Sequence, residues 1–352
     1  MISISEAILN SLSSRSELSR LKYAAYYGFL TILQRHMDTA IMNPIVDTAN
    51  WTAFHVAAFN GHINIVEFYT DKLDDVNPGY KSLDILRGQT PLHLAAQRGH
   101  FDIVEHITKL LENKNPADDY GVTPLHSAAV SGHLDIVKYL IELVDEKNPK
   151  AGLEGDDRTP IHDAAVGGHV DVIEYLLQYN QNDINPISRG QTVLHIAAQY
   201  GHKNVFLFYK DKLANLNPGK VSKDQFSGRT PLHDAAQRGE MDIIEYLIPL
   251  IDDPNPEDDN GITPLHLAAA NGHLSVVQYI IPLVNDKNPK DGEYWGELTA
   301  LHRAALRGHL EVVKYLAPIV PSIDVKSLNN KTPLEYARAN GHNEIVQFLE
   351  NF

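Results

Sequence analysis

The chain repeats one short motif nine times, and this repetition constrains the fold more than any other feature. Each copy has a threonine, then Pro-Leu-His or a near variant, a pair of small residues that is usually Ala-Ala, and a Gly-His about four residues later. The motif threonines are Thr52, Thr90, Thr123, Thr159, Thr192, Thr230, Thr263, Thr299 and Thr332. Self-similarity at an interval of roughly 20 to 50 residues is typical of stacked units, each too small to bury its own apolar face. The chain is therefore predicted to be a repeat array and not two or three separate globular domains.

The intervals between the threonines are themselves periodic. The numbers of successive threonines differ by 38, 33, 36 and 33, and then by the same four values again, so that Thr52 corresponds to Thr192 and Thr90 to Thr230. Residues 115–150 and 255–290, aligned with this offset, are identical at 23 of 36 positions, which indicates tandem duplication of a four-repeat block. We expect a single domain with these parts: an N-terminal capping segment and degenerate repeat (1–51), two four-repeat blocks (52–191 and 192–331) and a C-terminal capping repeat (332–352).

Each repeat is predicted to form two short helices. Thr-Pro starts a helix well, because threonine accepts hydrogen bonds from the exposed first amides and proline fits the first helical position. The alanine pair keeps this first helix thin, and the glycine ends it. A second helix follows, and its apolar residues recur at helical spacing, as at Ile136 and Leu140. A degenerate tenth copy is visible near the start of the chain, at Leu21, Ala24, Ala25 and Gly28.

Thr-Pro-Leu-His-x-Ala at a period near 33 resembles the ankyrin repeat, and residues 123–137 are similar to its consensus. The resemblance covers nearly the whole chain. It implies an all-α solenoid of helix-turn-helix units with projecting β-hairpin fingers. It also implies a non-enzymatic scaffold, without a cofactor, that binds one or more proteins through the concave groove and the long fingers. The alternative is a targeting or substrate-recognition subunit of a phosphatase or ubiquitin ligase complex, and an enzyme in its own right is the more remote one.

The residues usually associated with catalysis or metal binding have structural interpretations here. Of 18 histidines, 16 occupy fixed places in the repeat, where we expect them to bond backbone groups of neighbouring turns, and none forms a His-Glu-x-x-His pattern. The acidic pairs at 118–119, 156–157 and 258–259 precede hairpin motifs, where aspartate stabilises turns; paired catalytic carboxylates or calcium ligands are the alternatives. The sequence has no cysteine, phosphate loop or nucleophile elbow. We therefore expect no catalytic, cofactor or metal residues.

Charge and hydropathy narrow the classes of partner. The formal net charge of −15 repels phosphate backbones, so we expect no nucleic-acid partner. The sequence contains no run of about 18 apolar residues, which argues against membrane insertion. Residues 1–10 lack the basic and apolar regions of a secretory signal. We expect a soluble intracellular protein that is located in the cytoplasm. The nucleus is the alternative compartment.

Two sets of residues are candidates for partner contact, because repeat packing does not use them. The first set lies at variable positions of the first helices, where arginine and aromatic side chains are favoured interface anchors and an ordinary solvated face is the alternative. Its members are Phe59, Tyr200, Arg98, Arg238 and Arg307, of which the three arginines share one position. The second set lies in the long hairpins 79–89, 219–229 and 290–298, and packing of the tryptophan on its own hairpin is the alternative there. Its members are Trp295, Tyr294, Ile85, Leu86 and Phe226.

Two further features concern the ends of the repeats. The resemblance implies that hairpin asparagines are substrates of an asparaginyl hydroxylase, and Asn185, eight residues after Leu177 and preceded by Asp183-Ile184, fits this best. Proline also occurs at the end of three second helices late in the chain, at Pro249, Pro282 and Pro318. We expect each of these prolines to shorten or kink its helix.

Overall fold

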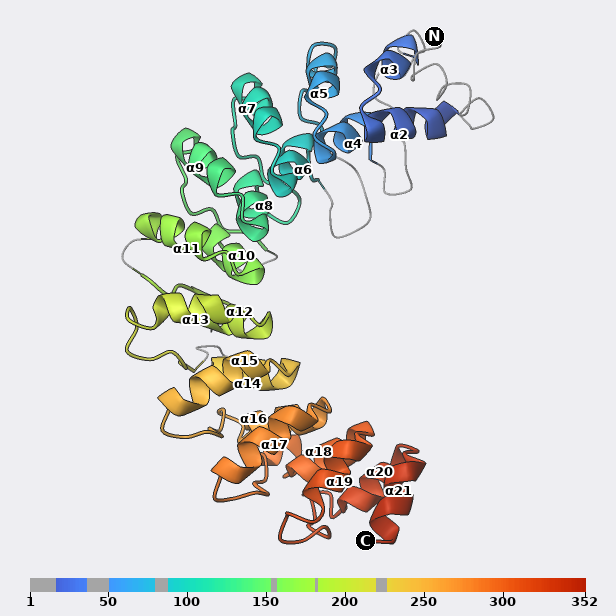
Figure 1. Cartoon of the computed structure of the whole chain (residues 1–352), viewed down its shortest axis with the longest axis vertical. Coiled ribbons are helices and arrows are strands. Elements are labelled where there is room, and N and C mark those ends of the chain that lie inside the picture. The colour runs from blue at the N-terminus through green and yellow to red at the C-terminus, as the bar shows by residue number, and fades with distance from the viewer. Residues whose placement is uncertain (1–16, 37–50, 80–87, 153–156, 181–182, 220–226) are drawn as a thin grey trace. The chain divides into compact units, whose positions relative to one another are not determined.

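The protein is an array of helix pairs, seen in a computed structural model that describes residues 17–36, 51–79, 88–152, 157–180, 183–219 and 227–352 (Figure 1). The chain divides into two compact units, Met1–Ile184 and Asn185–Phe352. Within each unit, the first helix of every pair packs against the first helices of the neighbouring pairs, and the second helices form another layer behind them. Ile85, Leu86 and Phe226 lie outside the described residues.

In the first unit, the degenerate repeat near the N-terminus forms a helix pair like the others. The first helices are α2 (Glu17–Tyr27), α4 (Ala53–Phe59), α6 (Pro91–Arg98), α8 (Pro124–Ser131) and α10 (Pro160–Gly167). The second helices are α3 (Leu30–His36), α5 (Ile63–Thr70), α7 (Phe101–Leu110), α9 (Leu134–Leu143) and α11 (Val170–Leu176), the last continued by the 3-10 turn η1 (Leu177–Tyr179).

The second unit opens with a short antiparallel hairpin of β1 (Ile187–Ser188) and β2 (Gln191–Thr192), in which Ile187 is opposite Thr192. Its first helices are α12 (Val193–Gln199), α14 (Pro231–Arg238), α16 (Pro264–Ala270), α18 (Ala300–Arg307) and α20 (Pro333–Ala339). Its second helices are α13 (Lys203–Tyr209), α15 (Met241–Leu247), α17 (Leu274–Ile280), α19 (Leu310–Leu316) and α21 (Asn343–Glu350), and its 3-10 turns are η2 (Ile248–Leu250), η3 (Ile281–Leu283) and η4 (Glu293–Trp295).

A threonine and a histidine together cap the first helices of the repeats from α4 to α18. Thr123 is the N-cap residue of α8; its backbone N–H donates to Nδ1 of His126 (3.2 Å), and its Oγ1 lies 2.9 Å from the same nitrogen. In the last repeat Glu335 takes the place of the histidine and accepts the hydrogen bond of the Thr332 N–H at 2.8 Å. Because threonine followed three residues later by glutamate is the usual capping box, the histidine ring acts as its equivalent in the other repeats.

The same histidines, and a second set, connect neighbouring repeats. Nε2 of His93 lies 3.0 Å from the carbonyl of Val122 in the next repeat, and Nε2 of His100 lies 3.0 Å from the carbonyl of Phe59 in the preceding one. The repeat that contains α6 and α7 is thus bonded to both of its neighbours. The interpretation of the motif histidines as backbone-bonding groups is confirmed.

Several asparagines of the Asn-Pro pairs have a role that the sequence did not reveal: Asn77, Asn115, Asn217 and Asn255. Oδ1 of Asn115 accepts a hydrogen bond from the N–H of Leu125, an otherwise unsatisfied amide in the first turn of α8. Asn255 does the same for Leu265 at the equivalent place in the duplicated block, also in the first turn of a helix. The end of one repeat therefore caps the first helix of the next.

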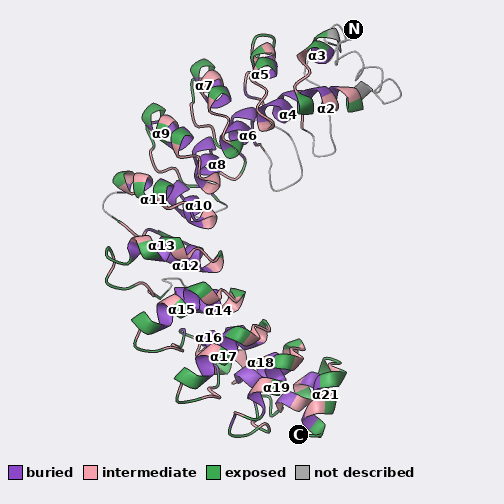
Figure 2. Ribbon diagram, in the orientation of Figure 1, coloured by how far each residue is buried: buried purple, intermediate pink, exposed green. Residues whose placement is uncertain are grey.

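The core lies between the two helix layers, where Figure 2 shows the buried residues gathered. The alanine pairs, such as Ala128 and Ala129, are fully buried, as are Ile136 and Leu140 on the second helix. Pro249 and Pro282 shorten their helices as expected: α7 and α9 run for ten residues each, whereas their counterparts α15 and α17 run for seven and continue as the 3-10 turns η2 and η3. Pro318 makes no such difference, because α19 runs for seven residues and so does its counterpart α11, which has Gln178 at the matching place.

Candidate functional site

The residue before the terminal glycine of each first helix forms an exposed row in the second unit. We call these five residues the C-terminal row: Tyr200, Arg238, Asn271, Arg307 and Asn340. All five are exposed, and the Tyr200 side chain, at 53% exposure, stacks on the ring of His202 (centroids 6.4 Å apart). Since Asn271 and Asn340 donate to carbonyls of their own helices, the two arginines and the tyrosine are the side chains that this row offers to a partner.

In the first unit, the equivalent arginine is fixed by an aromatic ring. Arg98 is exposed, and its guanidinium carbon lies 4.6 Å from the centroid of the Phe59 ring. Phe59 in turn packs edge-on against Trp51 at 5.1 Å. A cation over an aromatic face is worth about 0.5 to 1 kcal/mol at an exposed site, so this pair favours the orientation in which Arg98 lies over the ring. The two predicted residues Phe59 and Arg98 therefore form one small surface.

Sequence reasoning missed two exposed tyrosines beside this surface. Tyr26 and Tyr27 end helix α2, are 48% and 53% exposed, and lie against each other with ring centroids 4.8 Å apart. They stand two residues and one residue before Gly28, the places that Phe59 and Arg98 hold in their own repeats. The degenerate motif of the first repeat concealed this correspondence, although the position of the glycine could have revealed it.

The long hairpin 290–298 presents one aromatic side chain and packs the other. Its ends pair at Lys290 and Thr299, and neighbouring repeats hold it on both sides: the Gly292 N–H donates to the Asn260 carbonyl, and the Gly296 carbonyl accepts from the Leu328 N–H, both at 2.8 Å. Tyr294 is 81% exposed, the most exposed of the large apolar side chains described.

Trp295 is half-buried beside Tyr294, with the two ring centroids 5.6 Å apart, and its Nε1 is buried without a hydrogen-bond partner among the described residues. The packing interpretation therefore fits Trp295, while Tyr294 is the residue at the tip. The hairpin is a turn of 3-10 helix and not an extended pair of strands.

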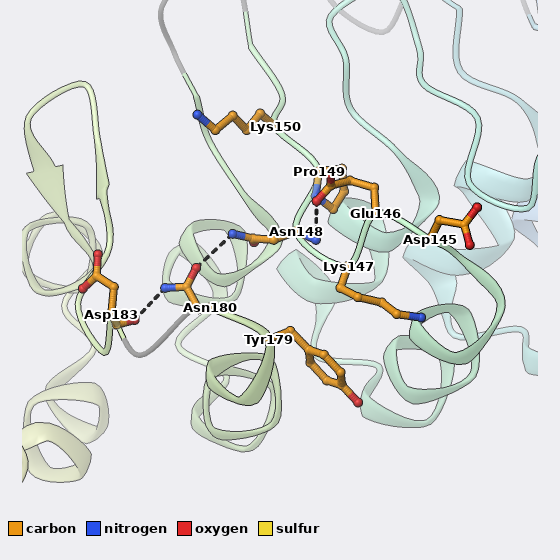
Figure 3. A pocket seen from close by; sticks show the side chains of 9 residues that line it. All are labelled: Asp145, Glu146, Lys147, Asn148, Pro149, Lys150, Tyr179, Asn180 and Asp183. Carbon is orange, nitrogen blue, oxygen red and sulfur yellow. Dashed lines mark hydrogen bonds between the residues drawn. The ribbon is translucent and has the colours of Figure 1, made fainter.

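A cavity of about 810 Å³ lies between the loops that follow α9 and α11 (Figure 3). Its polar side chains bond one another: Nδ2 of Asn148 donates to Oδ1 of Asn180 at 2.9 Å, and Nδ2 of Asn180 donates to the Asp183 carbonyl at 2.6 Å. Lys147 turns away to the carbonyls that end α9. These contacts brace two consecutive loops, and the described residues contain no group of His, Asp or Glu arranged to hold a metal ion.

The paired aspartates of the short hairpins stabilise turns, as predicted. Oδ1 of Asp118 accepts hydrogen bonds from the N–H groups of Tyr120 and Val122, both at 2.9 Å, and burial raises the pKa of its carboxyl. Asp258 has the same turn contacts and in addition pairs with the buried Arg229 at 3.3 Å.

One position of the duplicated blocks has reversed its charge. In the first unit Asp163 is buried and pairs with Arg158 at 2.9 Å. At the equivalent place in the second unit stands Arg303, which binds the buried Asp291 through Nε at 2.9 Å and through its second nitrogen. Burial raises the pKa of Asp291, and the charge of Arg303 opposes that shift. The two halves are thus not chemically equivalent on this face.

These features define a class: a helical repeat protein whose packing residues are constant and whose exposed row varies from repeat to repeat. A family model described as ankyrin repeats (three copies) matches residues 21–115, 73–151, 143–217, 210–291 and 283–351. The chain belongs to the ankyrin-repeat family. Ankyrin repeats bind proteins, and the family is typically non-enzymatic. Of the helices described, none has the length and apolar character needed to cross a membrane.

Proposed function

We propose that this chain is a non-enzymatic scaffold that binds a protein partner through the face formed by the first helices and through the tip of the hairpin 290–298. The observation that carries the proposal is the C-terminal row, in which Arg238 and Arg307 are exposed in a chain of net charge −15. Neither arginine has an ion-pair partner among the described residues. Repeat packing uses neither side chain. We therefore infer that both serve recognition, because arginine is enriched in interface hot spots.

Tyr294 is the second part of the proposed interface. An aromatic ring that is 81% exposed costs free energy in water unless it is covered, and the backbone bonds of Gly292 and Gly296 fix the turn that carries it. A ring held in place before binding loses little conformational entropy when a partner covers it. A partner that covers this tip and the first-helix face would bury roughly the 1,600 Å² of a standard interface.

Cross-linked capture from native lysate tests the proposal. Three proteins are compared with the wild type: Tyr294→Ala, a triple variant with Arg98, Arg238 and Arg307 changed to Glu, and a control with Lys210→Glu and Lys314→Glu on the second-helix layer. We expect a partner that is lost from the first two and kept by the control. A partner retained by all three would show that another surface binds. The identity of the partner then distinguishes a scaffold from a recognition subunit of an enzyme complex.

We also propose Asn185 as a substrate of an asparaginyl hydroxylase. It lies in the short connection between η1 and β1, outside every helix, where an enzyme reaches the backbone more easily than within a helix. Incubation of the folded chain with that enzyme, followed by peptide mass spectrometry, should show one added oxygen atom on the peptide that contains Asn185. A peptide of unchanged mass would remove the proposal.

A further inference from the structure

The two helix layers of the second unit differ in the balance of their exposed charges. On helices α12, α14, α16 and α18 the exposed charged side chains of the described residues are Arg238 and Arg307 alone, because Asp234 is buried and Arg303 is held by Asp291. The last first helix, α20, carries Glu335 and Arg338, and Arg338 pairs with Glu350. The second helices and the loops behind them carry charges of both signs with acidic residues in excess: Asp211, Asp242, Glu245, Asp252, Asp253, Asp286 and Glu311 against Lys210, Lys212 and Lys314. Helices α12, α14, α16 and α18 thus present positive charge beside a layer in which acidic residues predominate.

The distance between the two arginines indicates the shape of what they bind. They occupy the same position in helices α14 and α18, with α16 between them. Packed helices are about 8 to 10 Å apart, so the two positions are about 20 Å apart. One carboxylate or phosphate cannot bridge that distance, whereas an extended polypeptide covers it with about six residues at roughly 3.3 Å each.

We propose that the C-terminal row binds an extended acidic segment of a partner protein, in which two carboxylates about six residues apart pair with Arg238 and Arg307. This inference rests on the proposed function and adds the chemistry of the partner. Tyr200, at one end of the row and one repeat before Arg238, offers its ring to an apolar side chain about three residues beyond the nearer carboxylate. Arginine suits carboxylates because its planar fork donates two parallel hydrogen bonds.

The second-helix layer supplies a matched control. Lys210 at the end of α13 and Lys314 in α19 are exposed and lie outside the face that the first helices present. Reversing both changes the net charge by the same amount as reversing Arg238 and Arg307, without disturbing the paired arginines.

Selection from a library of random peptides of about 12 residues, displayed on phage and captured on the full chain, identifies the preferred sequence. We expect peptides with two Asp or Glu residues five to seven apart. The consensus peptide should bind the Arg238→Glu, Arg307→Glu protein about tenfold more weakly than the wild type, and the Lys210→Glu, Lys314→Glu protein as well as the wild type. A peptide with lysines in place of the two acids should bind the double variant better than the wild type. Circular dichroism verifies that each variant is folded.

Other outcomes overturn the inference in distinguishable ways. A neutral or basic consensus, or an affinity that the double variant does not change, rejects the acidic segment but leaves protein binding in place. Binding of a DNA oligonucleotide that is lost in the double variant reassigns the row to a nucleic-acid backbone. A library that yields no binder, together with a capture experiment that finds no partner, rejects the proposed function itself.

Discussion

Lowering the pH should unfold the array through its buried histidines. Burial lowers the pKa of four of them, to about 4 at His93 and His302 and to about 3 at His126 and His266. The hydrogen bonds of these rings also favour a lowered pKa. Nε2 of each ring faces a backbone carbonyl and therefore carries the proton, while Nδ1 accepts from the N–H of the capping threonine. A proton added to Nδ1 would remove this acceptor.

The size of the effect follows from the difference between the histidine pKa in the folded chain and that in the unfolded chain. A histidine in the unfolded chain has a pKa of about 6.5, so below that pH the unfolded chain binds more protons, and stability falls as the pH falls towards the folded values. Nothing is lost from these groups at higher pH. At about pH 5 each ring lowers the free energy of unfolding by about 2 kcal/mol, and the four together by about 8 kcal/mol.

Two buried carboxyls act in the opposite direction. Burial raises the pKa of Asp118 and Asp291, and a carboxyl that binds its proton more readily when folded adds stability as the pH falls. Because two carboxyls oppose four histidines, we expect a net loss of stability as the pH falls. Because a typical domain is stable by about 5 to 15 kcal/mol, the loss is large enough to unfold part of the array near pH 5.

Urea unfolding followed by far-UV circular dichroism, at several pH values between about 7 and 5, measures this dependence. The variant His126→Gln removes one titrating ring and should reduce the slope of stability against pH by about 1.4 kcal/mol per pH unit, whatever its stability at neutral pH. A variant slope equal to that of the wild type, or a wild type equally stable at both ends of the range, would refute the reasoning.

Two further predictions concern the packing between repeats. Gly99 has φ +79°, and a Cβ there would lie 2.5 Å from the His133 ring of the next repeat, whereas Gly341 has φ +75° and nothing within 4 Å. Gly99→Ala should therefore cost about 1 to 3 kcal/mol more than Gly341→Ala in urea unfolding, and equal costs would show that the ring does not restrict the site. Asn255→Ala should cost about 1 to 2 kcal/mol by leaving the Leu265 amide unsatisfied, while Asn288→Ala, whose Oδ1 has no hydrogen-bond partner among the described residues, should cost less. Similar losses from both asparagines, measured by thermal unfolding, would contradict the capping role.

The repeat period fixed most of the fold in advance, because each feature that it contains has a local physical cause. Threonine and proline start a helix, glycine ends it, and alanine allows close approach, wherever they occur in the array. The capping role of the Asn-Pro asparagines escaped notice because Asn115 and Leu125 belong to different repeats, and a contact across that junction depends on how the repeats stack. The spacing between motifs does not contain that information.

The candidate site was less predictable for a related reason. Position in the repeat identified Arg238, Arg307 and Tyr200 as exposed, and all three are. It could not distinguish Tyr294 from Trp295, since adjacent residues of one hairpin point in different directions that only the turn geometry determines. Nor could it show that Arg98 lies over Phe59, because the two residues come from different repeats.

The duplication distinguishes the residues that repeat packing requires from the residues that differ between the two blocks. Contacts that build the array recur at equivalent places in the two blocks, as the hydrogen bonds of Asn115 and Asn255 do. Some residues outside the packing do not recur: Arg303 stands where the first block has Asp163, and Arg307 where it has Gly167, although Arg98 recurs as Arg238. Since reversing a charge changes which ligands are attracted, the two blocks cannot favour the same segment at this place. The copies therefore share a framework and differ in the side chains that they carry at these places.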